Sequence, residues 1–397
     1  MKTGAKYIKS KFLSIKKIYI MGASDSGVKI ANYCLLKNKI VSISDVNQEQ
    51  EKDFFSKFKS DRNLINYNFG GHSKDFVKES SIIIHSTSIP LDDKTLNFAR
   101  EEGKIICSTI EFSAALISGK FIVVTGTNGK STLLQSLEYL IKKPEKNIFF
   151  SKRNSGRTIV DALCKQKRYD LVILELSVVE LNGLTNINPF MLVITNLIKD
   201  EGHTNQFGGY IAYLSAKFKW IKSIECNFEI FATDEVHSQL NFVIDFKMLS
   251  ERCNRIFLKN IESQEAFICK LVDNLSNHYS WISKVINEAD VLESLKIVLN
   301  KQLIKIPLSK GIKLYLDTNA KNIDATLWTL KLLDLQHILI TSNKKVMDEP
   351  VINPSMCKDI IIIRNKSNLR NEWINALTEA VKSSYKHEVK NILFSPG

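Results

Sequence analysis

Short apolar runs recur along the chain, and each one ends in a small polar turn that opens into a helical pattern. The first run, 17–21, is expected to form a buried strand, and the turn 22–27 leads into a helical pattern that reaches Leu36. A second strand is expected at 40–44 and ends at Asp45. Since strand, turn, helix and strand in this order make a βαβ unit, the pattern predicts a parallel sheet.

The same alternation continues through most of the chain. Segment 221–305 mixes apolar and charged positions and carries no clear motif, but from about residue 306 the strand and helix pattern resumes. Further strands are predicted at 82–84, 104–106, 123–125, 169–177, 191–197, 312–316, 337–340, 359–363 and 391–394. Strands that alternate with helices in this way are typical of an α/β fold.

One of the turns has the composition of a phosphate-binding loop. Gly126 and Gly129 would let the backbone pass close to a polyphosphate, and the following helix N-terminus would direct N–H groups at the anion. Lys130 is placed to reach the β and γ phosphates, and Ser131 or Thr132 to bind Mg²⁺ through a hydroxyl group. The other interpretation is a plain glycine turn. The predicted nucleotide-binding residues are Gly126, Thr127, Asn128, Gly129, Lys130, Ser131 and Thr132.

The position of this loop suggests how the chain divides into domains. At 397 residues the chain is too long for one ordinary core. We predict an N-terminal Rossmann-like domain at 1–116 and a central P-loop-type ATPase domain with a mostly parallel sheet at 117–304. A C-terminal Rossmann-like domain is predicted at 305–397 and is expected to be shortened.

The turn after the first strand is a second candidate for phosphate binding. Gly22, Ser24 and Gly27 lie where a dinucleotide-binding turn has its glycines, although a serine replaces the middle one. Asp45, at the end of the next strand, lies where a ribose hydroxyl would be bound. The alternative is an ordinary α/β turn that binds no ligand.

Other candidate residues follow strands near the phosphate loop. Glu175 ends a buried strand and is placed to bind Mg²⁺ directly or through water, and the alternative is an acidic strand end without a role. His203 and Lys217 come after the next strand, but composition alone does not make them a site. His85, after an earlier strand, is expected to be a loop histidine rather than a ligand.

The composition favours a globular protein and narrows the class of partner. The net charge is +13, but the lysines are spread along the chain. The chain uses lysine, isoleucine and asparagine heavily, and this composition explains much of the charge. We therefore expect no nucleic-acid partner. No apolar run reaches the roughly 20 residues that span a bilayer, and we expect a cytoplasmic protein with no membrane partner. The 7 cysteines stand singly, which favours reduced thiols over zinc or redox pairs.

Together these stretches resemble the Mur ligase family, and within it the D-glutamate-adding members. Segment 125–132, TGTNGKST, is similar to the family's ATP loop, and Glu175–Ser177 to its E-L-S strand end. Asn154–Gly156 resembles its N-x-G turn, 216–217 its A-K pair, and 317–322, DTNAKN, the member-specific D-S-K-A-T-N segment. The resemblance implies an ATP-dependent, amide-forming ligase. It would add D-glutamate to UDP-N-acetylmuramoyl-L-alanine through an acyl phosphate, in peptidoglycan biosynthesis.

The resemblance also implies cofactors and a role for each matched residue. ATP and Mg²⁺ would be bound by a monomer, with Asp317 meeting the nucleotide when the third domain closes. Lys217 would be carbamylated, which needs a lowered pKa and makes an anion able to bind Mg²⁺; the alternative is an ordinary surface lysine. The implied catalytic residues are Lys130, His203 and Lys217, and the implied metal ligands are Ser131, Glu175, His203 and Lys217. The implied substrate-binding residues are Gly22, Ser24, Gly27, Asp45, Asn154, Ser177 and Lys321.

Several positions depart from the family pattern. Asn319 stands where the family has a lysine, and Lys321, two places on, would have to take the role of that lysine. Glu180 replaces a glutamine, and Asn205 replaces an aspartate. The expected H-N-x-x-N and H-R-x-E segments are missing between 270 and 310. Three interpretations therefore stay open: a D-glutamate ligase, a non-catalytic relative that still binds nucleotide, and a ligase that uses another acceptor.

Overall fold

The computed structural model describes residues 4–151, 156–185, 187–199, 201–249, 251–261, 263–283, 286–308, 311–317, 326, 329–330, 332–333, 337–341, 357–362 and 369–395. Asn154, Asn319 and Lys321 lie outside these ranges. By its contacts the chain divides into two units. The first comprises Met1–Leu134 and Lys142–Glu262, and the second comprises Gln135–Ile141 and Ser263–Gly397.

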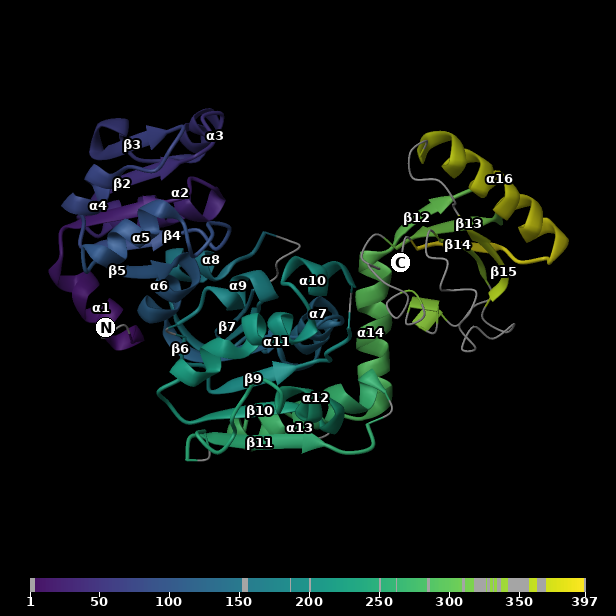
Figure 1. Ribbon diagram of the computed structural model, residues 1–397. Coiled ribbons are helices and arrows are strands. Elements are labelled where there is room, and N and C mark those ends of the chain that lie inside the picture. Colours follow the sequence, from purple (N-terminus) through teal and green to yellow (C-terminus); the bar gives the residue numbers. More distant parts are fainter. Residues whose placement is uncertain are drawn as a thin grey trace. The chain divides into compact units, whose positions relative to one another are not determined.

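The first unit begins with a parallel sheet of five strands in the order β3-β2-β1-β4-β5, the order of a Rossmann-like domain (Figure 1). Met21 at the end of β1 pairs with Ser44 and with His85, so the turns after β1, β2 and β4 share one edge of the sheet. The strands are β1 (Lys17–Met21), β2 (Ile40–Asp45), β3 (Ile65–Phe69), β4 (Ile82–His85) and β5 (Ile105–Ser108). The helices are α1 (Ala5–Ser14), α2 (Asp25–Leu36), α3 (Gln50–Lys57), α4 (Lys74–Glu79), α5 (Lys94–Glu101) and α6 (Thr109–Leu116), with a 3₁₀ turn at Arg62–Leu64.

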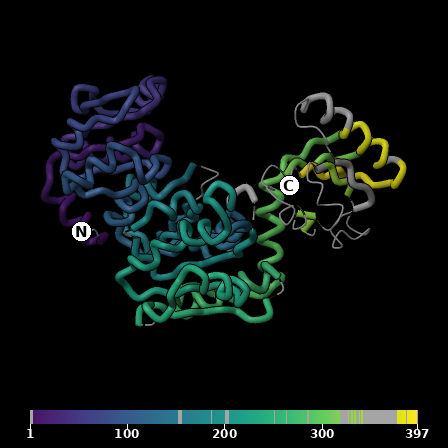
Figure 2. The backbone as a smooth tube through the Cα atoms, viewed as in Figure 1, coloured from purple at the N-terminus to yellow at the C-terminus, as the bar shows by residue number. Residues whose placement is uncertain are grey.

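From α6 the backbone enters β6 and a second parallel sheet, with the order β11-β10-β9-β6-β8-β7 (Figure 2). Val124 in β6 pairs with Glu175 in β8 and with Val193 in β9, which brings the ends of these three strands together. The strands are β6 (Ser118–Thr125), β7 (Ile148–Ser151), β8 (Arg168–Glu175), β9 (Met191–Ile194), β10 (Phe228–Thr233) and β11 (Cys253–Leu258). The helices are α7 (Lys130–Ile141), α8 (Ile159–Cys164), α9 (Val178–Asn182), α10 (Glu201–Gln206), α11 (Tyr210–Phe218) and α12 (Asp234–Leu240), with a 3₁₀ turn, η3, at Lys219–Ser223.

One hydrophobic core joins the two sheets of the first unit. Buried residues from the first sheet, such as Ile20, and from the second, such as Val123, belong to the same cluster. Lys29 in α2 adds a polar link, because its ammonium group lies 2.5 Å from Asp25 and 2.7 Å from Asp161 of α8. Partly exposed ion pairs contribute little, so the shared apolar core supplies most of the stabilisation.

The second unit contains two long helices and a sheet of its own. Its sheet has the order β12-β13-β16-β14-β15, with β12 antiparallel to β13 and the other pairs parallel. Its elements are α13 (Gln264–His278), α14 (Glu288–Gln302), β12 (Ile304–Pro307), β13 (Lys313–Leu316), β14 (His337–Thr341), β15 (Cys357–Ile362), α16 (Leu369–Lys386) and β16 (Asn391–Phe394). None of the helices in the described ranges is long and apolar enough to cross a membrane.

The α/β class, the three sheets and their mostly parallel pairing are confirmed. Each predicted strand is present, and β16 has the bounds expected from the sequence. In the described part of segment 221–305, where no motif was found, β10, α12 and β11 alternate in the same way, and the helices α13 and α14 then follow one another. The boundaries at 116 and 304 stay predictions.

Candidate active site

The phosphate-binding loop connects β6 to α7 and has two residues in conformations that favour glycine. Gly126 has a φ of 146° and Gly129, the N-cap of α7, has a φ of 77°. A Cβ atom added to Gly126 would lie 2.0 Å from Oγ1 of Thr195, so no other residue fits there without movement. The helix therefore starts directly at Lys130, with Ser131 and Thr132 in its first turn.

Residues that follow β9 hold the loop in shape. The backbone N–H of Asn128 donates to Oδ1 of Asn196 at 2.9 Å, and the Thr195 hydroxyl donates to the Asn128 carbonyl at 2.6 Å. The N–H of Thr127 donates to the Asn196 carbonyl at 3.0 Å. The loop is thus preorganised without a ligand. Thr195 and Asn196 were not predicted as site residues from the sequence, although polar residues directly after a buried strand could have indicated them.

Two lysines converge on one carbonyl of the loop. Nζ of Lys130 donates to the carbonyl oxygens of Gly126 and Thr127, each at 2.8 Å. Nζ of Lys217, from α11, donates to the Gly126 carbonyl, also at 2.8 Å. Lys130 therefore brings positive charge to the place where the loop would receive phosphates, which favours a polyanionic ligand.

Lys217 is buried, and this rules out an ordinary surface lysine. Its side chain is 1% exposed, and Nζ lies 5.1 Å from the centre of the Tyr213 ring. Burial, and secondly the nearby charge of Lys130, lower the pKa of Lys217 well below its ordinary value. A neutral amine can add CO₂, so the environment fits the implied carbamate, which itself stays a prediction.

Glu175 lies beside the loop with one oxygen still available. The Ser131 hydroxyl donates to Oε1 of Glu175 at 2.6 Å, while Oε2 has no hydrogen-bond partner among the described residues. The side chain is only 5% exposed, and a buried carboxylate oxygen without a donor is costly. A hydroxyl and a carboxylate are oxygen ligands of the kind that Mg²⁺ prefers, so these two residues fit that ion.

Further metal ligands are not brought to this point by the described side chains. In the part of the chain that the structure describes, no three His, Cys, Asp or Glu residues cluster as a metal site. His203 lies in α10, but its side chain is not among those described. The protonated ammonium form of Lys217 would repel a cation, and only its carbamate would be an anionic ligand.

The first turn, after β1, is closed by hydrogen bonds of its own. Oδ2 of Asp45 accepts from the N–H of Ala23 at 2.8 Å, and Oδ1 accepts from the N–H of Asn47 at 2.9 Å. Gly22 has a φ of 103°, and a Cβ atom on Gly27 would lie 2.0 Å from the Gly22 carbonyl oxygen. Asp45 thus shapes the turn, and its predicted contact with a ribose is untested. Ser24 is the N-cap of α2 and makes no side-chain cap hydrogen bond.

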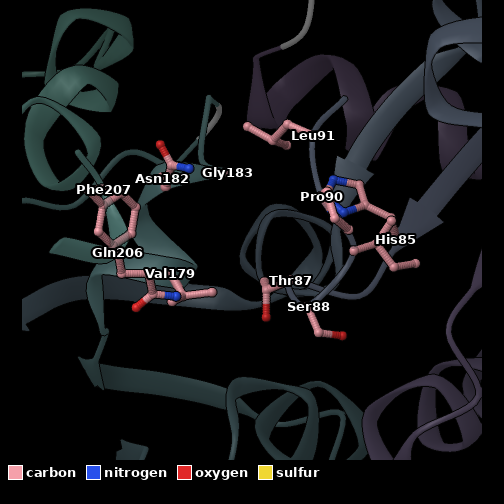
Figure 3. A pocket seen from close by; sticks show the side chains of 11 residues that line it. His85, Thr87, Ser88, Pro90, Leu91, Val179, Asn182, Gly183, Gln206 and Phe207 are labelled. Atoms are coloured by element: carbon pink, nitrogen blue, oxygen red, sulfur yellow. The ribbon is translucent and has the colours of Figure 1, made fainter. Parts of the chain in front are cut away.

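A cavity of about 190 Å³ lies between the loop after β4 and the helices α9 and α10 (Figure 3). His85, Thr87, Ser88, Pro90 and Leu91 lie on one side of it in the figure, opposite residues of the second sheet's helices. Those opposite residues are Val179, Asn182, Gly183, Gln206 and Phe207. From the sequence, His85 was expected to be a loop histidine, and none of the residues on the opposite side of the cavity was predicted.

His85 is a buried residue at the end of β4. It is 3% exposed, and its Nδ1 lies 3.0 Å from the Ser86 carbonyl oxygen. Burial lowers the pKa of His85 below its ordinary value, although the carboxylate of Glu111 acts in the opposite direction. The ring therefore presents a neutral, polar edge to the cavity.

Two other predicted site residues, Ser177 and Asp317, have partners close to them in sequence. The Ser177 hydroxyl, at the start of α9, donates to Oε2 of Glu180 at 2.6 Å, as part of a capping box. Asp317 belongs to the second unit, where it is buried and accepts from the Thr329 hydroxyl at 2.5 Å. Asn154 and Lys321 lie outside the described residues.

Comparison with known proteins bears on both fold and family. Residues 124–245 match the profile of the Mur ligase middle domain. The UDP-N-acetylmuramoylalanine--D-glutamate ligase of Geotalea daltonii is 28% identical over 204 residues, which are 51% of this chain and 44% of that protein. The enzyme of the same name from Bdellovibrio bacteriovorus is 28% identical over 212 residues, 53% of this chain and 45% of that protein. The aligned segment thus spans less than half of either relative.

A solved structure gives the same result for the whole fold. MurF from Acinetobacter baumannii matches with a TM-score of 0.51 and 9% identity, over 99% of this chain and 96% of that one. At this identity the match concerns the fold alone. Together with the curated relatives, the match of residues 124–245 to the middle-domain profile supports a Mur ligase, most like the D-glutamate ligases of that family.

Proposed function

We propose that the protein is an ATP-dependent ligase that adds D-glutamate to UDP-N-acetylmuramoyl-L-alanine in peptidoglycan biosynthesis. The observation that carries the proposal is the arrangement at the phosphate loop, where Lys130 and Ser131 lie beside the half-satisfied carboxylate of Glu175. The choice of acceptor and amino acid is supported by the names of the D-glutamate ligases that the chain resembles.

In the proposed reaction, the alanine carboxylate attacks the γ-phosphorus of ATP. A P–O bond forms to give an acyl phosphate, and the bond to the bridging oxygen breaks to release ADP. The amine of D-glutamate then attacks the acyl carbon, phosphate leaves, and the nitrogen loses a proton to give the amide. Catalysis of such a transfer depends on positioning and on stabilising charge at the phosphoryl oxygens.

The residues of the loop would supply most of that stabilisation. Lys130 would exchange its two carbonyl partners for phosphate oxygens, while the loop stays in shape through Thr195 and Asn196. Ser131 and Glu175 would hold Mg²⁺, with His203 and carbamylated Lys217 as further ligands. The bound ion would neutralise phosphate charge. Asp317 remains assigned to the nucleotide by resemblance.

The acceptor would lie along the edge shared by the first turn and the cavity. The UDP part is assigned to Gly22, Ser24, Gly27 and Asp45, and the muramoyl-alanine part to the cavity beside His85. Support comes from the pairing of Met21 with both Ser44 and His85, since it brings the two regions to neighbouring strand ends. A ligand at the carboxyl edge of a parallel sheet is typical of such folds.

A non-catalytic relative that binds nucleotide is the second candidate. It is favoured by the hydrogen bond between Ser177 and Glu180, which uses a hydroxyl group assigned to substrate. The departures at Asn205 and Asn319 point the same way. In this case ATP would bind at the loop and would not be turned over.

The test is ADP release by the purified chain with UDP-N-acetylmuramoyl-L-alanine, with and without D-glutamate. Release that requires both substrates is expected. Saturable ATP binding without release would favour the non-catalytic relative, and release with another acceptor or amino acid would favour the third interpretation. Lys130→Ala should abolish nucleotide binding or turnover, while Lys167→Ala, at an exposed position after α8, serves as the control.

A further inference from the structure

The first helix, α1, is anchored by one face and presents lysines on the other. Ile8 and Phe12 are buried in the core of the first unit, and the Phe12 ring meets Phe112 of α6 edge to face, with centroids 5.3 Å apart. Lys6 and Lys9 are exposed and, at helical spacing, share the opposite face with Leu13. The outward face is therefore basic with a leucine in it.

The turn after α2 extends this face with a second exposed leucine. Nζ of Lys39 donates to the carbonyl oxygen of Ile15 at 2.7 Å, and the N–H of Ile40 donates to that of Lys16 at 2.8 Å. These bonds hold the turn against the end of α1. Leu13 is 72% exposed, and Leu36, just before the turn, is 70% exposed.

Several lysines surround the two leucines. Lys6, Lys9, Lys16 and Lys37 are exposed, and Lys11 and Lys39 are half-buried. We call the patch formed by Lys6, Lys9, Leu13, Lys16, Leu36 and Lys37 the α1 surface. Lys6, Lys9 and Lys16 are close in sequence, and the fold adds Lys37 from the end of α2. Four to eight basic residues gathered on a helical surface are typical of binding to anionic lipid head groups.

We propose that the α1 surface binds the anionic surface of a lipid bilayer. Lysines would meet the phosphate head groups, and the two leucines would insert among the acyl chains just below them. Outward-pointing leucines suit a fluid apolar layer and gain nothing from nucleic-acid phosphates. The binding would be peripheral and reversible, and it revises the expectation that the chain has no membrane partner.

The place of the α1 surface in the fold is compatible with the proposed function. It lies at the amino ends of β1 and β2, beside Lys16 and Ile40. The candidate active site lies at the carboxyl ends of the parallel strands, where Gly22 follows β1. A bilayer on the α1 surface would therefore leave the site open to its ligands.

The test is flotation of the full chain with vesicles of 30% phosphatidylglycerol and 70% phosphatidylcholine, compared with pure phosphatidylcholine. Binding is expected only to the anionic vesicles, and it should weaken at high salt because the attraction is screened. The triple variant K6Q/K9Q/K16Q should partition about 100-fold more weakly. The double variant L13S/L36S should lose about tenfold or more for each leucine.

Two controls separate this surface from the general positive charge. Met248→Ser changes a side chain that is also 72% exposed, and Lys259→Gln removes an exposed lysine elsewhere in the first unit, so neither should alter partitioning. The proposal is overturned if the chain does not bind anionic vesicles or if the control variants lose as much binding as the α1 variants. It is also overturned if L13S/L36S leaves vesicle binding unchanged, as binding of nucleic acid through charge alone would predict. ADP release without vesicles should be unchanged in all α1 variants, so failure here is distinct from failure of the ligase proposal.

Discussion

The two glycine turns of the first unit are built alike and end up with different chemistry. Each follows a parallel strand, precedes a helix and lies next to a strand that ends in an acid, Asp45 for the first turn and Glu175 for the second. At the first turn both oxygens of Asp45 accept backbone N–H groups. At the second, Glu175 accepts one hydroxyl and keeps one oxygen without a partner among the described residues.

This difference indicates which turn is prepared for a cation. A carboxylate whose hydrogen bonds are complete stabilises its loop, whereas a buried carboxylate with an unfilled site is costly unless a ligand completes it. At the second turn, two lysines also donate to the Gly126 carbonyl oxygen. Among the described contacts of the first turn, no lysine donates to a carbonyl oxygen of the turn. The comparison therefore separates an acid that shapes its own turn from an acid that is prepared for a cation.

The largest effect is expected for Glu175→Gln. Loss of the charge should lower ADP release about 10²-fold or more, because one preorganised electrostatic contact is worth that much. The free energy of unfolding should rise by about 1 kcal/mol, since a strained functional group is removed. Mg²⁺-dependent kinetics and urea unfolding measure both. Unchanged release, or a requirement for Mg²⁺ that does not move, would remove Glu175 from the metal site.

Like Glu175→Gln, Lys217→Met should lower ADP release and raise the free energy of unfolding. We expect about 100-fold lower ADP release and a free energy of unfolding that is about 1 kcal/mol higher. Because the pKa of Lys217 is lowered, the unfolded chain binds a proton that the folded chain lacks at pH values between that pKa and the ordinary 10.5. The free energy of unfolding of the protein with an uncarbamylated Lys217 should therefore rise with pH as the pH approaches the ordinary 10.5, and Lys217→Met should lose that slope.

Matched variants sharpen the test of Lys217. Lys222→Met, at an exposed position of η3, should change neither ADP release nor the pH slope. Lys217→Ala should regain activity when a short-chain carboxylate is added, because that anion would replace the carbamate. Full activity of either Lys217 variant without an additive would contradict the assigned role.

Asp45→Asn should produce the smallest change in ADP release, and its effect on stability should have the opposite sign. An amide cannot accept from the N–H groups of both Ala23 and Asn47, so one loop donor is left without its partner. The free energy of unfolding should fall by about 1–3 kcal/mol, while ADP release at saturating substrate stays within a few-fold. Thermal melts with and without the UDP precursor measure the change in stability. A loss of turnover as large as that of Glu175→Gln would end the contrast between the two acids.

The sequence was informative where chemistry follows directly from strand ends. Residues 126–132 and Glu175 could be predicted because adjacent parallel strands bring their carboxyl ends to one edge. The burial of Lys217 could not, since it depends on how α11 packs against the loop. The same is true of Asn196, whose amide completes the loop from another strand. Segment 221–305 was missed because its strands alternate with helices without any chemical motif.

The distance between the two sides of the cavity is fixed by contacts that lie outside the cavity. One wall follows β4 of the first sheet, and the other is formed by α9 and α10 of the second. At a separate place Lys29 of α2 joins Asp161 of α8, and one apolar core continues between the sheets. An acceptor one residue longer or shorter would thus meet a gap of fixed width, and its reacting carboxylate would stop at the wrong distance from the nucleotide. Length discrimination would be a property of the scaffold rather than of any contact with the acceptor.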